Sequence, residues 1–142
     1  MAQLITYLTF NGNCREAMSF YRSCLGGKLY LQTVGESPMA DDLPENLKDF
    51  ILQGYLKNGA LMLMATDMVG EEGLRRGNST AIMIECSSEE EMKLFYDRLA
   101  AGGEPTDPID TTHWGALFGG LTDRYGNRWL LNFDQSKNKP KS

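Results

Sequence analysis

Residues Thr112–Phe133 read THWGALFGGLTDRYGNRWLLNF and predict two strands joined by a short turn at positions 123–127. Gly126 lies in this turn, where it can adopt the positive φ that such turns need. Glycines also interrupt the first strand, at positions 115, 119 and 120. Glycine inside a strand is typical of a sharp bend or of a ligand close to the backbone. We therefore expect a curved hairpin with a cavity on its concave side.

Length and composition limit the class of protein. The chain has 142 residues, 42% of them hydrophobic, which suits one domain with its own core. A net charge of -5 argues against a nucleic-acid partner, because phosphate binding needs clustered lysine and arginine. We find neither a signal peptide nor a run of about 18 apolar residues. We expect a cytoplasmic protein with no membrane partner.

Cysteine and histidine are scarce. The three cysteines, Cys14, Cys24 and Cys86, are an odd number and form no CxxC motif. This pattern favours buried, reduced thiols over a disulfide scaffold or a metal cluster. His113 is the one histidine, which leaves little basis for a zinc site or a serine-histidine-aspartate triad.

The first half of the chain predicts the order strand, helix, strand, strand, strand. Asn13 with Glu16 forms a capping signature at the start of the helix, and Gly26-Gly27 ends it. Asn58-Gly59 is a strong hairpin-turn signal between the last two strands. The segment between the second and third strands, rich in proline and acid, is expected to be a loop with a short helical turn. The four strands are expected at residues 4–10, 28–34, 50–57 and 60–66.

The second half repeats this order. Glu16, Phe20, Tyr21 and Gly27 recur 75 residues later as Glu91, Phe95, Tyr96 and Gly102. Ser87 or Ser88 is expected to cap the second helix, and strands are expected at residues 80–86 and about 104–109, before the opening hairpin. We predict one domain over residues 1–136, with repeat units of about 1–67 and 78–134. Residues 137–142 are predicted to be a disordered tail.

This repeat resembles the vicinal oxygen chelate superfamily, which includes glyoxalases, bleomycin-resistance proteins and extradiol dioxygenases. The sequences of residues 7–13, 61–67 and 114–129 resemble those of its PhnB-like branch. The resemblance implies an α+β fold in which two βαβββ units form a curved mixed sheet around a cleft, with the helices outside. It also implies that a divalent metal is held by the first and fourth strands of each unit.

The residues at these positions do not suit a metal. The fourth-strand positions hold Leu63 and Leu130, and the first-strand positions lie near Ile5 and Thr80. Gln53 stands where PhnB-like relatives often have histidine. Divalent metals prefer imidazole, thiolate or carboxylate ligands. We therefore predict no cofactor, with a divalent metal as the alternative.

Strand alternation suggests which side chains line the cleft. Arg128, Leu130 and Asn132 are expected to share its side, whereas Trp129, Leu131 and Phe133 pack against helices. On the first strand, Tyr7 is expected to face the cleft. On the fourth strand, Leu61, Leu63 and Ala65 are expected to face it. The predicted substrate-binding residues are Tyr7, Gln53, Leu63, Trp114, Arg128, Leu130 and Asn132.

Each of these residues also has a structural interpretation. Arg128 could pair an anionic end of a ligand or make a structural salt bridge, and Tyr7 could belong to the core. His113 is a weak candidate for a catalytic base. Asp67 and Asp123, which follow strands, are expected to cap turns.

The leading hypothesis is a metal-free homodimer that binds a small apolar or anionic molecule in its cleft. The first alternative is a metal-dependent lyase, isomerase or dioxygenase-like enzyme that uses His113 with Glu85 or Asp67. The second alternative is a resistance protein that sequesters an antibiotic between its subunits. We find no glycine-rich loop of the kind that S-adenosylmethionine-dependent methyltransferases use, so that activity is not expected.

Overall fold

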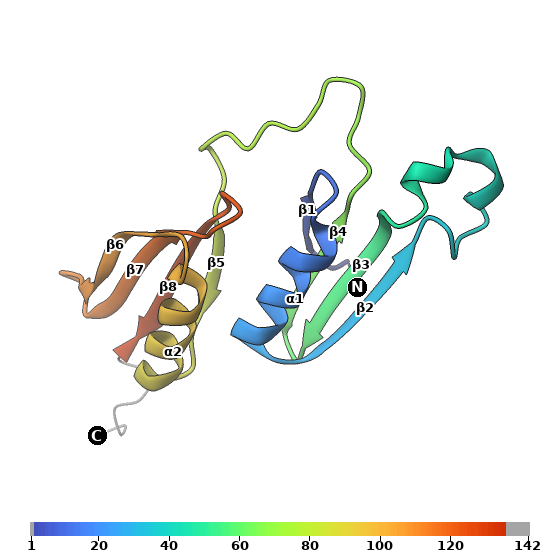
Figure 1. The fold of residues 1–142 in the computed structure, drawn as a ribbon. Helices are drawn as coiled ribbons and strands as arrows, with labels where there is room; N and C mark the ends of the chain where they lie inside the picture. The colour runs from blue at the N-terminus through green and yellow to red at the C-terminus, as the bar shows by residue number, and fades with distance from the viewer. Residues whose placement is uncertain (1, 136–142) are drawn as a thin grey trace. The chain divides into compact units, whose positions relative to one another are not determined.

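The computed structural model describes residues 2–135, and the chain divides into two compact units, Met1–Arg75 and Arg76–Ser142. Figure 1 shows the elements of both units. The first unit contains β1 (Thr6–Thr9), α1 (Cys14–Leu25), β2 (Lys28–Thr33), two 3-10 turns (Ala40–Asp42 and Glu45–Leu47), β3 (Ile51–Asn58) and β4 (Leu61–Thr66). The second contains β5 (Ile82–Glu85), α2 (Glu89–Ala100), β6 (Glu104–Thr111), β7 (Ala116–Thr122) and β8 (Arg128–Asp134).

Both units have the same topology. Their four-stranded sheets have the orders β1-β4-β3-β2 and β5-β8-β7-β6. In each sheet the first strand pairs in parallel with the fourth, and the other pairs are antiparallel. The predicted α+β fold with two βαβββ units is therefore confirmed.

The predicted element boundaries differ from the structure mainly at strand ends. The first strand of each unit is shorter than expected, with four residues in β1 and four in β5. β6 is longer than expected and continues to Thr111. The loop between β2 and β3 does contain short helical turns, as predicted. The predicted disordered tail, residues 137–142, lies outside the described residues.

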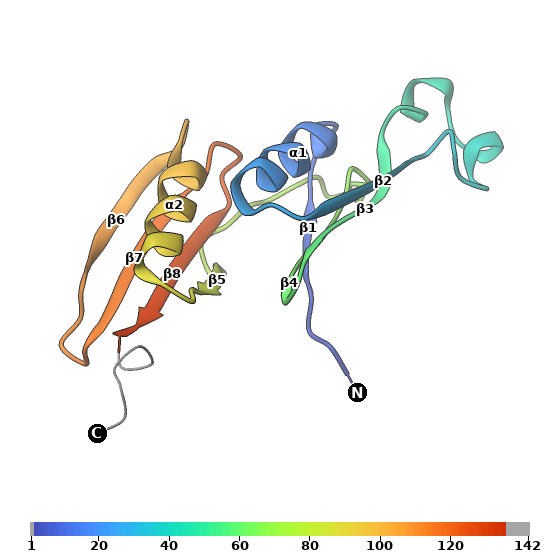
Figure 2. The ribbon, with the colours of Figure 1, turned by 90° about the horizontal axis from the view of Figure 1, so that it is seen from below.

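Each sheet has one face covered by its own helix. α1 packs on the first sheet and buries Ala17, Met18 and Tyr21 against it (Figure 1). α2 packs on the second sheet and buries Met92, Tyr96 and Leu99 (Figure 2). In β8, Trp129, Leu131 and Phe133 are buried and alternate with half-buried residues, which confirms the predicted facing of that strand.

The predicted N-cap position of α1 is confirmed, but the predicted capping by the Asn13 side chain is wrong. Asn13 occupies the N-cap position, but its side chain makes no capping hydrogen bond. The carboxylate of Asp67, 3% exposed at the end of β4, accepts hydrogen bonds from the backbone N–H groups of Gly12 and Cys14, both at 2.9 Å. A negative charge is favourable at a helix N-terminus, so a distant residue performs the task that local sequence predicts for Asn13.

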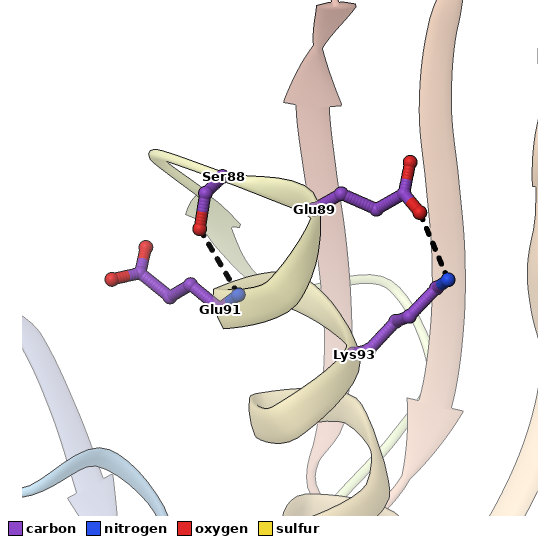
Figure 3. Close-up of polar contacts among 4 residues, drawn as sticks. All are labelled: Ser88, Glu89, Glu91 and Lys93. Carbon is purple, nitrogen blue, oxygen red and sulfur yellow. Dashed lines mark hydrogen bonds and ion pairs between the residues drawn. The ribbon is translucent and has the colours of Figure 1, made fainter.

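The cap of α2 is local. The Ser88 side chain accepts a hydrogen bond from the backbone N–H of Glu91, as Figure 3 shows. The Glu91 carboxylate in turn accepts one from the backbone N–H of Ser87. On the next turn, Lys93 pairs with Glu89 at 2.9 Å (Figure 3). Of the two predicted cap residues, Ser88 is therefore the cap.

The glycines of β7 make room for packing inside the second unit. A Cβ at Gly119 would lie 3.1 Å from the ring of Tyr96 and 2.9 Å from the side chain of Ile109. The Tyr96 hydroxyl donates to the backbone oxygens of Asp107 and Gly120, at 3.0 and 2.9 Å. The close approach at Gly119 thus serves the protein's own tyrosine.

Candidate functional site

The face of the first sheet that α1 does not cover carries exposed aromatic side chains. Tyr7 and Tyr30 are 54% and 52% exposed. Strand pairing places Tyr7 opposite Met64, Met64 opposite Tyr55 and Tyr55 opposite Tyr30. Directly paired residues point to the same face of a sheet. We call this continuous line across all four strands the aromatic row (Tyr7, Met64, Tyr55 and Tyr30).

Polar pairs flank the aromatic row on the β2–β3 hairpin. On one side Lys28 lies opposite Lys57, and on the other Gln32 lies opposite Gln53. We call these the lysine pair and the glutamine pair. Because side chains alternate along a strand, both pairs share the face of Tyr30 and Tyr55. All four side chains are exposed.

A groove of about 390 Å³ lies on this hairpin. Tyr30, Gln32, Gln53 and Tyr55 line it together with Leu31. The rings of Tyr30 and Tyr55 stack with centroids 4.8 Å apart and planes 25° from parallel. Gln53, which was predicted from the sequence as a binding residue, is one of the residues that line this groove.

Most of this surface was not predicted from the sequence. Tyr30, Tyr55 and the lysine pair were not predicted as site residues. The alternation of side chains along residues 28–33 and 50–57 could have indicated them. Lysine, tyrosine and glutamine occupy every second position there, which places them on one face of each strand.

The predicted facing of β4 is wrong. Leu63 and Ala65 are 5% and 0% exposed, and they pair with Leu56 and Leu8 on the face that α1 covers. The error is one residue in register, which turns a side chain to the opposite face. Met64 and Met62 stand on the open face instead. Leu63 therefore belongs to the core, and Met64 is the counterpart of Leu130.

The open face of the second sheet carries three of the predicted site residues. Arg128, Leu130 and Asn132 are half-buried and alternate with the core residues of β8, as predicted. The Arg128 guanidinium donates to the backbone oxygen of Asn78 at 3.2 Å, and Asn132 donates to both carboxylate oxygens of Glu85 at 3.0 Å. Arg128 thus anchors the chain before β5, and this contact agrees with a structural role.

Acidic side chains occupy the edge strand of the second sheet. Glu104, Asp107 and Asp110 of β6 lie opposite Thr122, Gly120 and Phe118 of β7. A Cβ at Gly120 would lie 3.0 Å from both the Asp107 carboxylate and the Leu130 side chain, so these two share the open face. This face therefore differs in charge from the open face of the first sheet.

His113 and Trp114 lie in the exposed turn between β6 and β7. Trp114 is 64% exposed, and its ring meets the imidazole edge to face with centroids 4.8 Å apart. Asp110, the carboxylate closest in sequence on the N-terminal side, accepts a hydrogen bond from the backbone N–H of Thr111 at 2.8 Å. In residues 2–135 no hydrogen bond orients the imidazole, so His113 lacks the partner that a catalytic base usually has.

The donor set does not fit a divalent metal. Tyr7, Met64, Met83 and Leu130 stand at corresponding positions of the first and fourth strands on the open faces, since Tyr7 pairs with Met64 and Met83 with Leu130. None of these side chains is a preferred ligand for zinc, magnesium or iron. Within the described part of the chain, no group of three or more histidine, cysteine or acidic residues could hold a metal ion.

Asp123 stabilises its turn, as predicted, whereas Asp67 accepts hydrogen bonds at the distant starts of α1 and β3. The second oxygen of Asp67 accepts from the backbone N–H of Ile51 at 2.8 Å. Asp123, also 3% exposed, accepts from the backbone N–H groups of Tyr125 and Asn127 and from the indole of Trp129 at 2.7 Å. Both carboxylates are thus used within their own units.

The cysteines are buried thiols, as predicted, and none of the three is part of a disulfide. Burial raises the pKa of Cys14 to about 12, with Asp67 adding to the effect, and it raises the pKa of Cys86 to about 12, with Glu91 and Glu85 adding. A thiol with such a pKa is neither a good nucleophile nor a good metal ligand near neutral pH.

Comparison with known proteins agrees with this architecture. Residues 3–131 match the family model described as the Glyoxalase/Bleomycin resistance protein/Dioxygenase superfamily. The chain belongs to this superfamily. The resemblance found in the sequence is therefore confirmed. Among residues 2–135, no helix is both long and apolar enough to cross a membrane.

Several relatives cover nearly the whole chain. Protein PA1353 from Pseudomonas aeruginosa is 36% identical, with a TM-score of 0.83, over 94% of this chain and 98% of that one. Protein YjdN from Escherichia coli (strain K12) is 28% identical over 91% of this chain and 93% of its own. A PhnB protein from Bacillus cereus, titled a putative 3-demethylubiquinone-9 3-methyltransferase, is 21% identical over 93% of this chain and 99% of that one, with a TM-score of 0.69, and it shares the fold.

Proposed function

We propose that this superfamily member binds a small apolar or anionic molecule on the open faces of its sheets, without a bound metal. The aromatic row carries the proposal. Large aromatic side chains exposed in a line across a sheet are a feature of binding surfaces, because their burial by a ligand is favourable. Tyr7 and Tyr30, each more than half exposed, are the clearest examples.

The metal-free part of the proposal follows from the donor set. A metal held by the first and fourth strands would meet phenol, thioether and aliphatic side chains at Tyr7, Met64, Met83 and Leu130. These groups offer no carboxylate, imidazole or thiolate.

A metal-dependent enzyme has weaker support. Its proposed ligands were His113 with Glu85 or Asp67, but Asp67 already accepts three backbone hydrogen bonds and Glu85 accepts the amide of Asn132. If Asp67 bound a metal instead, the buried N–H groups that it accepts from would be left unsatisfied.

Sequestration of an antibiotic differs from the leading proposal only in the ligand. A susceptibility assay with and without the gene tests it.

Native mass spectrometry of protein purified without added metal or chelator tests the proposal. We expect a dimer mass that carries a small organic adduct or no adduct. One divalent ion per chain, removed by EDTA, would contradict the metal-free proposal and would direct mutagenesis to His113, Glu85 and Gln53. A monomer mass at micromolar concentration would contradict the proposed homodimer alone.

A further inference from the structure

Three pairs of identical residues face each other across the β2–β3 hairpin: Lys28 with Lys57, Tyr30 with Tyr55 and Gln32 with Gln53. From this arrangement we propose that the open side of the hairpin seats a planar aromatic molecule bearing a carboxylate or phosphate group. The inference rests on the proposed function, to which it adds the chemical class of the ligand and the residues that select it.

The lysine pair supplies the charge argument. Like charges placed directly opposite each other destabilise a strand pair. No ion pair involving Lys28 or Lys57 is found among residues 2–135, where Lys48 and Lys93 do have carboxylate partners. An oxyanion between the two ammonium groups would replace this repulsion with two attractions. The pair therefore selects an anionic group.

The tyrosine pair supplies the aromatic argument. Tyr30 and Tyr55 already stack with centroids 4.8 Å apart. Their pairing continues through Met64 to Tyr7, so an apolar strip crosses the sheet beside the lysines. Aromatic rings and thioethers both make favourable contacts with a further ring. A planar ligand can therefore extend the stack that the protein begins.

The glutamine pair lies in the groove, on the side of the tyrosines opposite the lysine pair. Gln32 and Gln53 each offer an amide with donors and an acceptor, and both line the groove of about 390 Å³ beside the tyrosines. Residues two apart on a strand lie about 7 Å apart. The ligand should thus carry its anionic group on the lysine side of its ring system and any hydrogen-bonding group on the glutamine side.

The second unit cannot provide this site. Its corresponding edge strand, β6, has Glu104, Asp107 and Asp110 where β2 has lysine, tyrosine and glutamine, as judged by their pairing with the next strand. Carboxylates would repel an anionic ligand. The inference therefore assigns the aromatic anion to the first unit alone.

Two nearly isosteric probes test the inference, namely 2-naphthoate, which is anionic, and 2-naphthamide, which is neutral. Amide NMR spectra of the full chain give both the affinity and the location. We expect 2-naphthoate to shift the signals of β2 and β3 and to bind about fivefold more tightly than 2-naphthamide, as for an exposed charge pair.

Variants separate charge from stacking. Lys28→Gln combined with Lys57→Gln should abolish the preference for 2-naphthoate, whereas the matched control Lys93→Gln on α2 should leave it unchanged. Tyr55→Leu should weaken both probes about fivefold. Thermal unfolding of each variant confirms that the exposed substitutions leave the fold intact.

Each result has a distinct meaning. Equal affinity for the two probes, or a preference that survives the double lysine variant, would overturn the anionic class. Shifts confined to residues 128–132 would overturn the location while the proposed function stood. If neither probe shifts any signal, the inference fails, and the adduct in native mass spectrometry then decides the proposed function separately.

Discussion

The two units share a scaffold but present different surfaces. Each has a four-stranded sheet of the same order, one covering helix and a buried aspartate that accepts backbone hydrogen bonds. The open faces differ: the edge strand β2 carries lysine, tyrosine and glutamine, whereas the corresponding positions of β6 carry only acids. The covered faces are constrained by packing, and the open faces are not. Function in this chain is therefore expected to differ between the units.

The interiors of the two units should be equally unreactive. At pH 8, a rise in the pKa of Cys14 and Cys86 from 9.0 to about 12 lowers the thiolate fraction about a thousandfold. We expect iodoacetamide to label both cysteines very slowly in the native protein and rapidly in urea, as measured by peptide mass spectrometry. Fast native labelling of one cysteine would show that its unit opens.

The raised pKa values of Cys14 and Cys86 also make the free energy of unfolding depend on pH in the alkaline range. The folded protein holds both thiols protonated at pH values where the unfolded chain, with thiol pKa values near 9.0, ionises. The thiols therefore contribute fully below about pH 9, and the free energy of unfolding should fall from pH 9 toward pH 12. Urea titrations across this range measure the slope, and Cys14→Ala with Cys86→Ala should flatten it.

Substitution of the two buried aspartates tests whether the stability of each unit depends equally on one side chain. Asp67→Ala removes the acceptor of three backbone N–H groups, and Asp123→Ala removes that of two N–H groups and the Trp129 indole. Each should cost about 3 kcal/mol or more of unfolding free energy, because buried donors lose a charged partner. Chemical denaturation gives the values. A loss below 1 kcal/mol would mean that water or another group replaces the carboxylate.

The third strand of each unit contains a glycine whose substitution tests how tightly each unit is packed at that point. Gly54 and Gly119 occupy corresponding positions, opposite Ala65 and Leu131. A Cβ at Gly119 would meet the Tyr96 ring and the backbone of Ile109, whereas one at Gly54 would mainly meet a terminal methyl of Leu31. Gly119→Ala should therefore cost about 2 kcal/mol and Gly54→Ala less than about 1 kcal/mol. Equal losses would show that Leu31 is as rigid as Tyr96.

The sequence predicted the scaffold well and the surface poorly, for a physical reason. The Ser88 cap, the glycines that follow both helices and the Asn58-Gly59 turn depend on local patterns, and the structure contains them. The facing of Leu63 depends on register, and one residue of error exchanges the two faces. Asp67 as the cap of α1 depends on a contact across more than 50 residues, which no local pattern specifies. The groove on β2 and β3 likewise requires knowing which strands are neighbours.

Substitution of the N-cap residues is expected to have the smallest effect on stability. It compares a helix start that is stabilised by a local residue with one that is stabilised by a distant residue. Ser88 accepts a hydrogen bond from Glu91 at 3.1 Å, so Ser88→Ala should lower the unfolding free energy by about 1 kcal/mol. Asn13→Ala should change it by less than about 0.3 kcal/mol, because the Asn13 side chain makes no cap bond and Asp67 already caps α1. Urea denaturation of both variants measures the difference. Equal losses would mean that Asn13 contributes to α1 in solution, and the two helices would then begin in the same way.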